Sequence, residues 1–137
     1  MVAILSPDAV SKVRMTVDEY LPADLPEGYR YELVNGVVEM SRIPGPAHDN
    51  PLARLTKLVY RYHIAKPHVI GHITLNGGVV IPGEDTVREP DLALYRTWPG
   101  DTESYEVWKQ YVPFVVAEVV ARGQSRRDYE DKRDDYR

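Results

Sequence analysis

Two acidic residues in this chain, Glu118 and Asp91, are candidate metal ligands because of their neighbours in the sequence. Glu118 lies within an otherwise apolar run, Phe114-Val-Val-Ala-Glu-Val-Val120, and an ionised carboxylate buried without a partner is very costly, so it needs a cation or strong donors. Asp91 follows Pro90 at the start of a second β-prone run, which we expect to lie beside the first. Mg²⁺ is typically held by one or two carboxylates together with waters and phosphate. The two carboxylates therefore predict a site for Mg²⁺ or Mn²⁺.

Lys132 is the third candidate, on a helix that we expect to follow the apolar run. It stands four residues after Asp128, so these two side chains share one face of the helix. A lysine near a metal site can orient water or stabilise charge that builds on a phosphate. Asp128 is equally consistent with an acidic residue favoured by the helix dipole.

Simpler interpretations of the same three residues stay open. Asp91 could cap a turn at the start of a strand, and Glu118 could form a buried structural ion pair with Arg88 or Arg122. Lys132 could belong to a solvated helix face, because that helix is rich in charge. Whether the three side chains converge decides between these interpretations and a metal site.

The pattern of the chain predicts a mixed central sheet flanked by helices, an α/β or α+β fold. Asn35-Gly36 between two β-prone runs indicates a β-hairpin over 29–40. Thr16 and Glu19 form a capping-box pattern before one helical turn. The remaining expected elements are a helix over 48–65 ended by Pro67, strands over 68–75, 79–81 and 92–95, an irregular insertion over 96–111 with Trp98 and Trp108, a strand over 113–120 buried on both faces, and a final helix capped by Ser125.

Composition limits the function classes. The 137 residues suit one domain, which we place at 15–137 after a loose arm over 1–14. The absence of cysteine excludes disulfides and thiolate metal sites, and His63, His68 and His72 lack a zinc-binding pattern. A net charge of −4 argues against tight passive binding to DNA, because such binding depends on a basic face. With no apolar run long enough for a membrane helix, we expect a cytoplasmic protein.

Five short motifs in order resemble the Uma2 family of the restriction endonuclease-like superfamily. They are Tyr31-Glu-Leu-Val-Asn-Gly36, Pro46-Ala-His48, Arg88-Glu-Pro-Asp-Leu-Ala93, Val116-Ala-Glu-Val-Val120, and Asp128 with Lys132 and Tyr136. The resemblance implies a PD-(D/E)xK fold and a Mg²⁺-dependent DNA endonuclease. It places the active site at Asp91, Glu118 and Lys132, with Glu32 and His48 contributing at the rim.

The chain departs from the family pattern at three places. Val119-Val120 follows Glu118 where the superfamily usually has Glu-x-Lys, so the lysine is expected on the next helix, at Lys132. Ala121-Arg122 replaces the usual Ser-Pro, and the chain ends at Arg137 where family members continue into further strands. We therefore expect a domain truncated at its C-terminal end.

Two functions stay open at this point. The first is an enzyme, a hydrolase that cuts DNA phosphodiester bonds in a metal-dependent reaction. The second is a nuclease-fold protein with weak or lost chemistry that binds DNA or another protein. For Glu32 the simpler interpretation is a cross-strand surface charge, and for His48 a solvent or packing role in the first turn of a helix. An open sheet edge also invites pairing, so a homodimer is expected as one arrangement.

Overall fold

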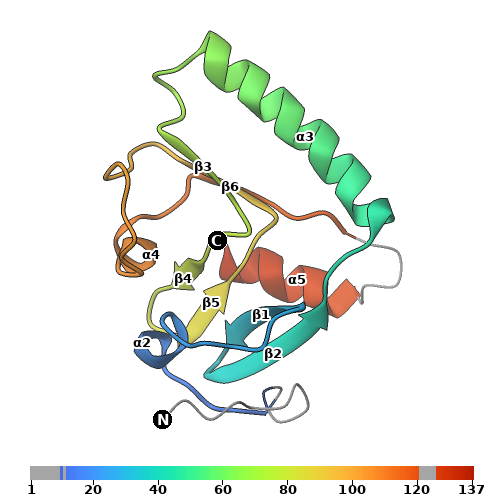
Figure 1. The fold of residues 1–137 in the computed structure, drawn as a ribbon, viewed down its shortest axis with the longest axis vertical. Coiled ribbons are helices and arrows are strands. Elements are labelled where there is room, and N and C mark those ends of the chain that lie inside the picture. The colour runs from blue at the N-terminus through green and yellow to red at the C-terminus, as the bar shows by residue number, and fades with distance from the viewer. Residues whose placement is uncertain (1–9, 11, 121–125) are drawn as a thin grey trace. The chain divides into compact units, whose positions relative to one another are not determined.

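The computed structural model describes Val10, residues 12–120 and residues 126–137, and these form two compact units. The first unit comprises Met1–Ile43 and Val80–Glu89, and the second comprises Pro44–Val79 and Pro90–Arg137. Figure 1 shows the elements of both. The single domain predicted over 15–137 stays a prediction, and each unit is described by itself.

The first unit is built on the predicted β-hairpin. β1 (Tyr29–Val34) pairs antiparallel with β2 (Val37–Arg42), in a register that sets Val34 opposite Val37. The two turn residues between them both have positive φ, 49° at Asn35 and 77° at Gly36. Asparagine and glycine tolerate this conformation best, so the Asn-Gly prediction is confirmed.

Two short strands extend the hairpin into a sheet with the order β2-β1-β5-β4. β4 (Val79–Ile81) was predicted, but β5 (Thr86–Arg88) was not. β5 pairs antiparallel with β1 through Leu33 and Val87. Three residues lying between two proline-containing segments are too few to show an alternating pattern, which explains why the sequence did not reveal this strand.

The core of the first unit gathers the inward-facing side chains of this sheet with the N-terminal segment. Its buried members are Val10, Tyr20, Tyr31, Leu33, Val38 and Val87. α2 (Val17–Tyr20) begins with the predicted capping box of Thr16 and Glu19. Within the expected loose arm, residues 1–9 and 11 lie outside the described residues. Val10 is fully buried and Arg14 bridges to Val37, so the described part of that segment is packed and not loose.

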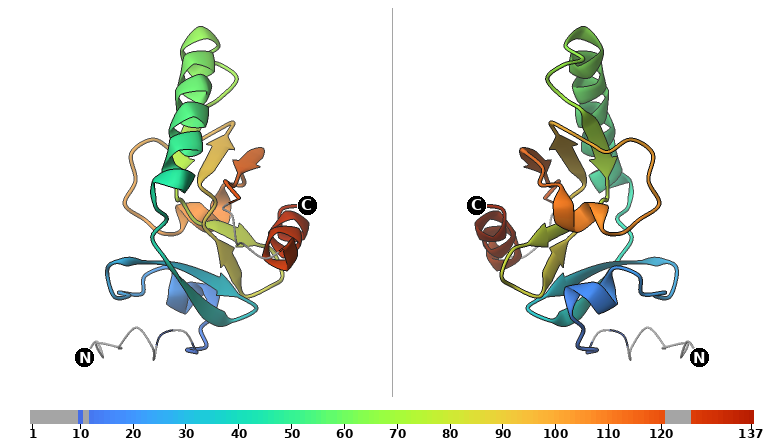
Figure 2. Two further views of the ribbon diagram at one scale, coloured as in Figure 1. Left: turned by 90° about the vertical axis from the view of Figure 1, so that its right-hand side faces the viewer. Right: turned by 90° about the vertical axis from the view of Figure 1, so that its left-hand side faces the viewer.

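The second unit contains the longest helix, α3 (Pro46–Ala65), shown in Figure 2. It starts two residues before the predicted start, because Gly45 is the N-cap and Pro46 occupies a first-turn position that tolerates proline. It ends at Ala65, before Pro67, as predicted. The prediction of this helix is confirmed, and it places His48 in the first turn.

The sheet of the second unit has the strand order β3-β6-β7. β3 (His72–Leu75) and β7 (Val115–Ala117) both pair antiparallel with β6 (Leu92–Tyr95), whose four residues are all buried. We expected one mixed central sheet. Over the described residues the structure instead has two sheets, and the strand pairs β1–β2, β1–β5, β3–β6 and β6–β7 are antiparallel. The α+β class is confirmed.

The apolar run around Glu118 differs from the prediction. We expected a strand over 113–120 buried on both faces, but β7 covers only Val115–Ala117 at the edge of its sheet, and Val115 is exposed. Apolar residues alone do not distinguish a central strand from an edge strand that a helix partly covers. Glu118 consequently follows the strand directly.

Two further helices complete the second unit, α4 (Val107–Gln110) within the expected irregular insertion and α5 (Arg126–Asp135). Within the insertion, the rings of Trp98 and Trp108 contact each other, with centroids 5.7 Å apart. The predicted N-cap Ser125 and the side chain of Asp128 lie outside what the structure describes. Among the described residues, no helix is long and apolar enough to cross a membrane.

Candidate active site

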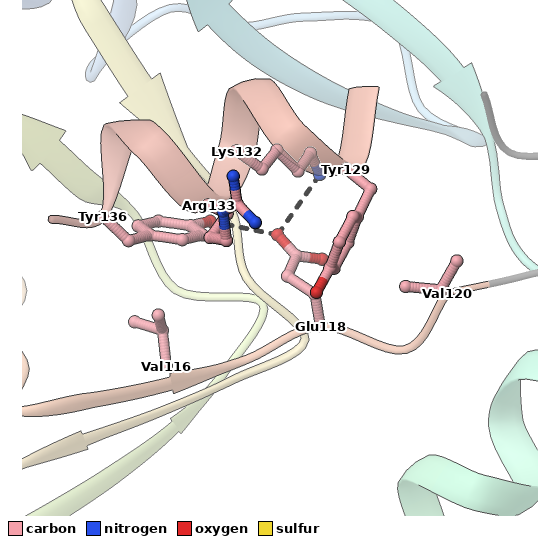
Figure 3. Close-up of a pocket in the computed structure, with 7 residues that line it drawn as sticks. All are labelled: Val116, Glu118, Val120, Tyr129, Lys132, Arg133 and Tyr136. Atoms are coloured by element: carbon pink, nitrogen blue, oxygen red, sulfur yellow. Dashed lines mark hydrogen bonds and ion pairs between the residues drawn. The ribbon is translucent and has the colours of Figure 1, made fainter. Parts of the chain in front are cut away.

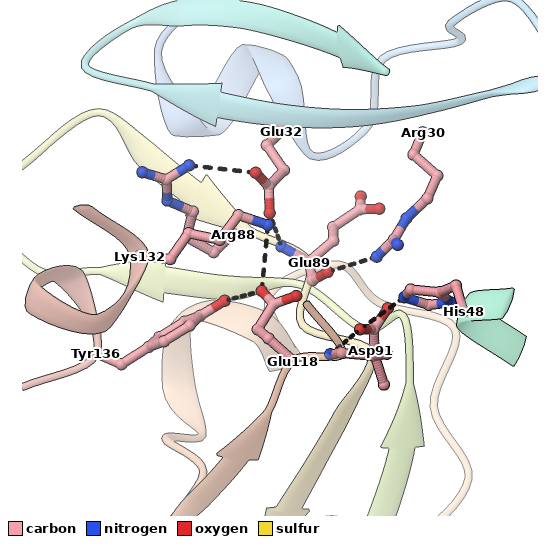
Figure 4. A network of polar contacts seen from close by, with 10 residues as sticks. Arg30, Glu32, His48, Arg88, Glu89, Asp91, Glu118, Lys132 and Tyr136 are labelled. Carbon is pink, nitrogen blue, oxygen red and sulfur yellow. Dashed lines mark hydrogen bonds and ion pairs between the residues drawn. The ribbon is translucent and has the colours of Figure 1, made fainter. Parts of the chain in front are cut away.

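Asp91 lies immediately before β6 and its side chain is almost completely buried, at 1% exposure. Its Oδ2 accepts a hydrogen bond of 2.7 Å from the backbone N–H of Val119. The same oxygen lies 3.0 Å from Nε2 of the buried His48, in the first turn of α3 (Figure 4). Asp91 is therefore held by the residue that follows Glu118 and by the helix start that carries His48.

Glu118 projects from the end of β7 toward α5. Its Oε1 accepts hydrogen bonds from Lys132 Nζ at 3.2 Å and from the Tyr136 hydroxyl at 3.0 Å, which Figure 4 shows. Glu118 and Lys132 are both largely buried, so the interpretation of Lys132 as a solvated helix residue is wrong. Among the described residues, Glu118 forms an ion pair with Lys132, and Arg88 forms one with Glu32. Arg122 lies outside the described residues.

Opposing effects act on the charge of Glu118. Burial raises the pKa of this carboxyl, and the negative charge of Asp91 raises it further. The ammonium of Lys132 and the hydroxyl of Tyr136 lower it, but burial is the largest effect and the net shift is upward. The repulsion between the two acids is what a shared cation would relieve.

A pocket of about 220 Å³ opens beside Glu118, between the end of β7 and α5 (Figure 3). The spacing of its lining residues follows the period of a strand in one segment and the period of a helix in the other. Along the β7 segment they are Val116, Glu118 and Val120, and along α5 and the residue directly after it they are Tyr129, Lys132, Arg133 and Tyr136. A step of two selects one face of an extended chain, and steps of three and four select one face of a helix. The pocket is thus lined by one face of each segment.

Glu32 belongs to the first unit and has a different set of partners. Its Oε2 pairs with Arg88 Nη1 at 3.2 Å, and its Oε1 accepts the backbone N–H of Glu89 at 3.0 Å (Figure 4). Arg30 donates to the carbonyl of Glu89 at 2.9 Å. Glu32 is largely buried, so the interpretation as a surface charge is wrong. Its predicted catalytic role stays a prediction.

The structure thus brings four of the five predicted residues together in the second unit, namely Asp91, Glu118, Lys132 and His48. Sequence reasoning gave no role to Tyr136, although its spacing of four from Lys132 places both on one helix face. Among the described side chains, no group of three or more His, Asp or Glu residues could hold a metal ion.

The family model described as "Uma2: Putative restriction endonuclease" matches residues 17–137. This match covers most of the chain. The chain belongs to the Uma2 family. No curated protein matched it. The family fits the α+β architecture, which is consistent with a restriction endonuclease-like fold, and it supports a nuclease-like function.

Proposed function

We propose that this Uma2 chain is a Mg²⁺- or Mn²⁺-dependent DNA endonuclease that hydrolyses phosphodiester bonds at the site of Asp91 and Glu118. The observation that carries the proposal is the convergence of the two acids. Asp91 accepts the N–H of the residue directly after Glu118, and its charge raises the pKa of Glu118. Neighbouring carboxylates that repel each other favour a shared cation.

The donor set fits the proposed ion. Carboxylate oxygens are the ligands that Mg²⁺ prefers, and one or two protein carboxylates suffice because the ion keeps several waters and binds substrate phosphate. Both contacts of Glu118 made by described residues fall on Oε1. Its Oε2 is the oxygen that we assign to the cation. When bound, such an ion polarises a phosphate oxygen and lowers the pKa of water.

The protein side chains around the acids have separate tasks in this proposal. His48 and the Val119 N–H fix the orientation of Asp91. Lys132 and Tyr136 fix Glu118 and favour its ionised form, which is the form that can ligate a metal. Lys132 also keeps a positive charge near the place where negative charge develops on the phosphate during hydrolysis.

A second candidate function has its own supporting observation. The ion pair of Lys132 with Glu118 at 3.2 Å, together with the Tyr136 hydrogen bond, also satisfies a buried carboxylate without any metal. A nuclease-fold protein that binds DNA or a protein and has lost its chemistry would retain this pair. The homodimer and the cytoplasmic location also remain predictions.

Plasmid cleavage separates the two candidates. We expect supercoiled plasmid to be nicked or linearised with Mg²⁺ or Mn²⁺, and Asp91→Asn and Asp91→Ala to lower the rate about a hundredfold or more. Asp101→Asn, at an exposed aspartate away from the site, is the matched control and should cut like the wild type. Circular dichroism checks that each variant is folded. Absent cleavage by the folded wild type would leave the binding protein as the better description, whereas metal-independent cleavage would contradict the cation that we assign to Asp91 and Glu118.

A further inference from the structure

The pocket beside Glu118 has more apolar wall than a metal site requires. Val116, Val120 and the rings of Tyr129 and Tyr136 line it together with the charged residues. Mg²⁺ and a phosphate need oxygen donors and cations, not hydrocarbon. The apolar part of the pocket therefore suits another part of a ligand, one that is flat or hydrophobic and lies next to the phosphate.

Tyr129 is well placed to contact such a group. Figure 3 shows its ring beside Glu118, on the side opposite the ring of Tyr136. The residue is 46% exposed, so a ligand can reach it. A volume of about 220 Å³ is below the roughly 300–1,000 Å³ of sites for drug-sized molecules. The pocket suits one planar ring system and is too small for a base pair.

Arg133 follows Tyr129 by one helical turn and supplies a cation at the same pocket. Its side chain is 48% exposed, and the ion pair with its neighbour Asp134 is long, at 3.5 Å. Exposed pairs of this kind are weak, so the guanidinium can exchange the carboxylate for a phosphate. One face of α5 thus offers an aromatic ring and a cation at the spacing of adjacent turns.

The charge of the chain favours stacking as the source of affinity. A protein that binds duplex DNA gains most of its affinity from neutralised phosphates, and a net charge of −4 does not favour that mode. Single-strand binders add stacking of bases on aromatic side chains, which does not depend on sequence. A base within a duplex is already stacked and paired, so it must leave the stack, at a cost in free energy, before it can enter a pocket of this size.

We infer that this pocket binds one unpaired nucleotide, with its base against Tyr129 and its phosphate at Arg133, and that the substrate is single-stranded or locally unpaired DNA. This rests on the proposed function, because the nucleotide lies at the site assigned to the metal. It adds the class of substrate, which the family description does not give.

Binding without divalent cations tests the inference separately from cleavage. A short fluorescein-labelled single strand and its duplex are titrated with the full chain in EDTA, and fluorescence anisotropy is measured. We expect the single strand to bind about tenfold more tightly than the duplex. Tyr129→Ala should weaken single-strand binding about tenfold, whereas Tyr129→Phe keeps the ring and should bind like the wild type.

Tyr105→Ala is the matched control, because Tyr105 is similarly exposed, at 54%, and does not line the pocket. Equal affinities of Tyr129→Ala and Tyr105→Ala, or a duplex bound as tightly as the single strand, would overturn the inference. Plasmid cleavage without single-strand preference refutes this inference alone. Single-strand binding through Tyr129 without any metal-dependent cleavage refutes the nuclease proposal, and the nucleotide is then a bound ligand and not a substrate.

Discussion

Glu32 and Glu118 are two largely buried glutamates whose contacts differ in one decisive way. Their side chains are similarly exposed, 14% for Glu32 and 18% for Glu118, and each has a basic partner at 3.2 Å. The partners of Glu32 use both oxygens, because Arg88 contacts Oε2 and the Glu89 N–H contacts Oε1. The described partners of Glu118, Lys132 and Tyr136, both use Oε1.

We interpret this difference as one between a structural cross-link at Glu32 and a candidate binding site at Glu118. Glu32 joins β1 to the segment that follows β5, and the burial of its charge is compensated by donors on both oxygens. Glu118 lines a pocket, and its pKa is raised despite the cation and hydroxyl beside it. Raised pKa values at a pocket are typical of functional groups, whereas saturated ion pairs are typical of structural ones. Burial and a basic partner alone do not distinguish the two.

The largest expected effect is on the stability of the cross-link. Arg88→Met keeps much of the side-chain volume but removes the guanidinium from the buried Glu32. Breaking a buried ion pair on one side typically costs about 3–5 kcal/mol, so the free energy of unfolding in urea should fall by roughly that amount. The double variant Glu32→Leu/Arg88→Met removes both charges, and should be more stable than Arg88→Met alone.

If Arg88→Met and the double variant were equally unstable, packing of the Arg88 side chain and not its charge would account for the loss. Lys132→Met is the corresponding change at the other glutamate. Glu118 there keeps the Tyr136 hydrogen bond, and its protonation costs less than that of an ordinary glutamate because burial raises its pKa. We expect Lys132→Met to lose less stability than Arg88→Met.

The second expected effect is a rise in Tm on metal binding, and this rise should depend on Glu118 and not on Glu32. A cation that binds only the folded chain stabilises it by about 2.7 kcal/mol at a hundredfold excess over its Kd. For a chain of this size, this corresponds to a rise in Tm of roughly 5–15 °C. We expect millimolar Mg²⁺ or Mn²⁺ to raise the Tm of the wild type, and Glu118→Gln to abolish the rise.

Glu32→Gln is the matched control for the metal experiment. It makes the same chemical change at a glutamate whose two carboxylate oxygens both have protein donors. It should lower the baseline Tm but keep the metal-induced rise. Equal rises in wild type and Glu118→Gln would place the ion elsewhere. A rise lost in Glu32→Gln but kept in Glu118→Gln would reverse the roles of the two glutamates.

The features predicted correctly from the sequence are those with strong local signals. Asn35-Gly36 requires a tight turn, the capping box at Thr16 starts α2, and the spacing of apolar residues with Pro67 bounds α3. Each depends on residues close together in the chain. The grouping of Asp91, Glu118 and Lys132 in one site depended on the order of motifs and on family resemblance. Local rules do not predict contacts over 28 or 14 positions, as between Asp91 and Val119 or between Glu118 and Lys132.

The features that the sequence did not reveal depend on tertiary pairing. β5 exists because Val87 pairs with Leu33, and three residues cannot show this in advance. β7 was predicted too long because an apolar run does not show where hydrogen bonding to β6 ends. The hydrogen bond from Tyr136 to Glu118 joins a strand end to a helix face, and only the fold determines that they meet.

The smallest expected effect concerns the metal-free protein and depends on the sign of the Glu118 pKa shift. A carboxyl whose pKa is raised in the folded state binds its proton more tightly there than in the unfolded chain. Ionising it therefore costs stability as the pH rises from the unfolded value, about 4.3, through the folded value. Glutamine resembles the protonated form and carries no such cost.

In EDTA, we accordingly expect Glu118→Gln to be no less stable than the wild type at neutral pH, and the wild type to lose stability relative to the variant as the pH rises through this window. Urea denaturation at several pH values, from about 4 to 7, measures the difference. The opposite slope, with the wild type gaining on the variant, would mean that Lys132 and Tyr136 outweigh burial. The ionised form of Glu118 would then be stabilised by its ion pair, as we expect for Glu32. The two glutamates would differ in their contacts but not in the effect of their ionisation on the free energy of unfolding.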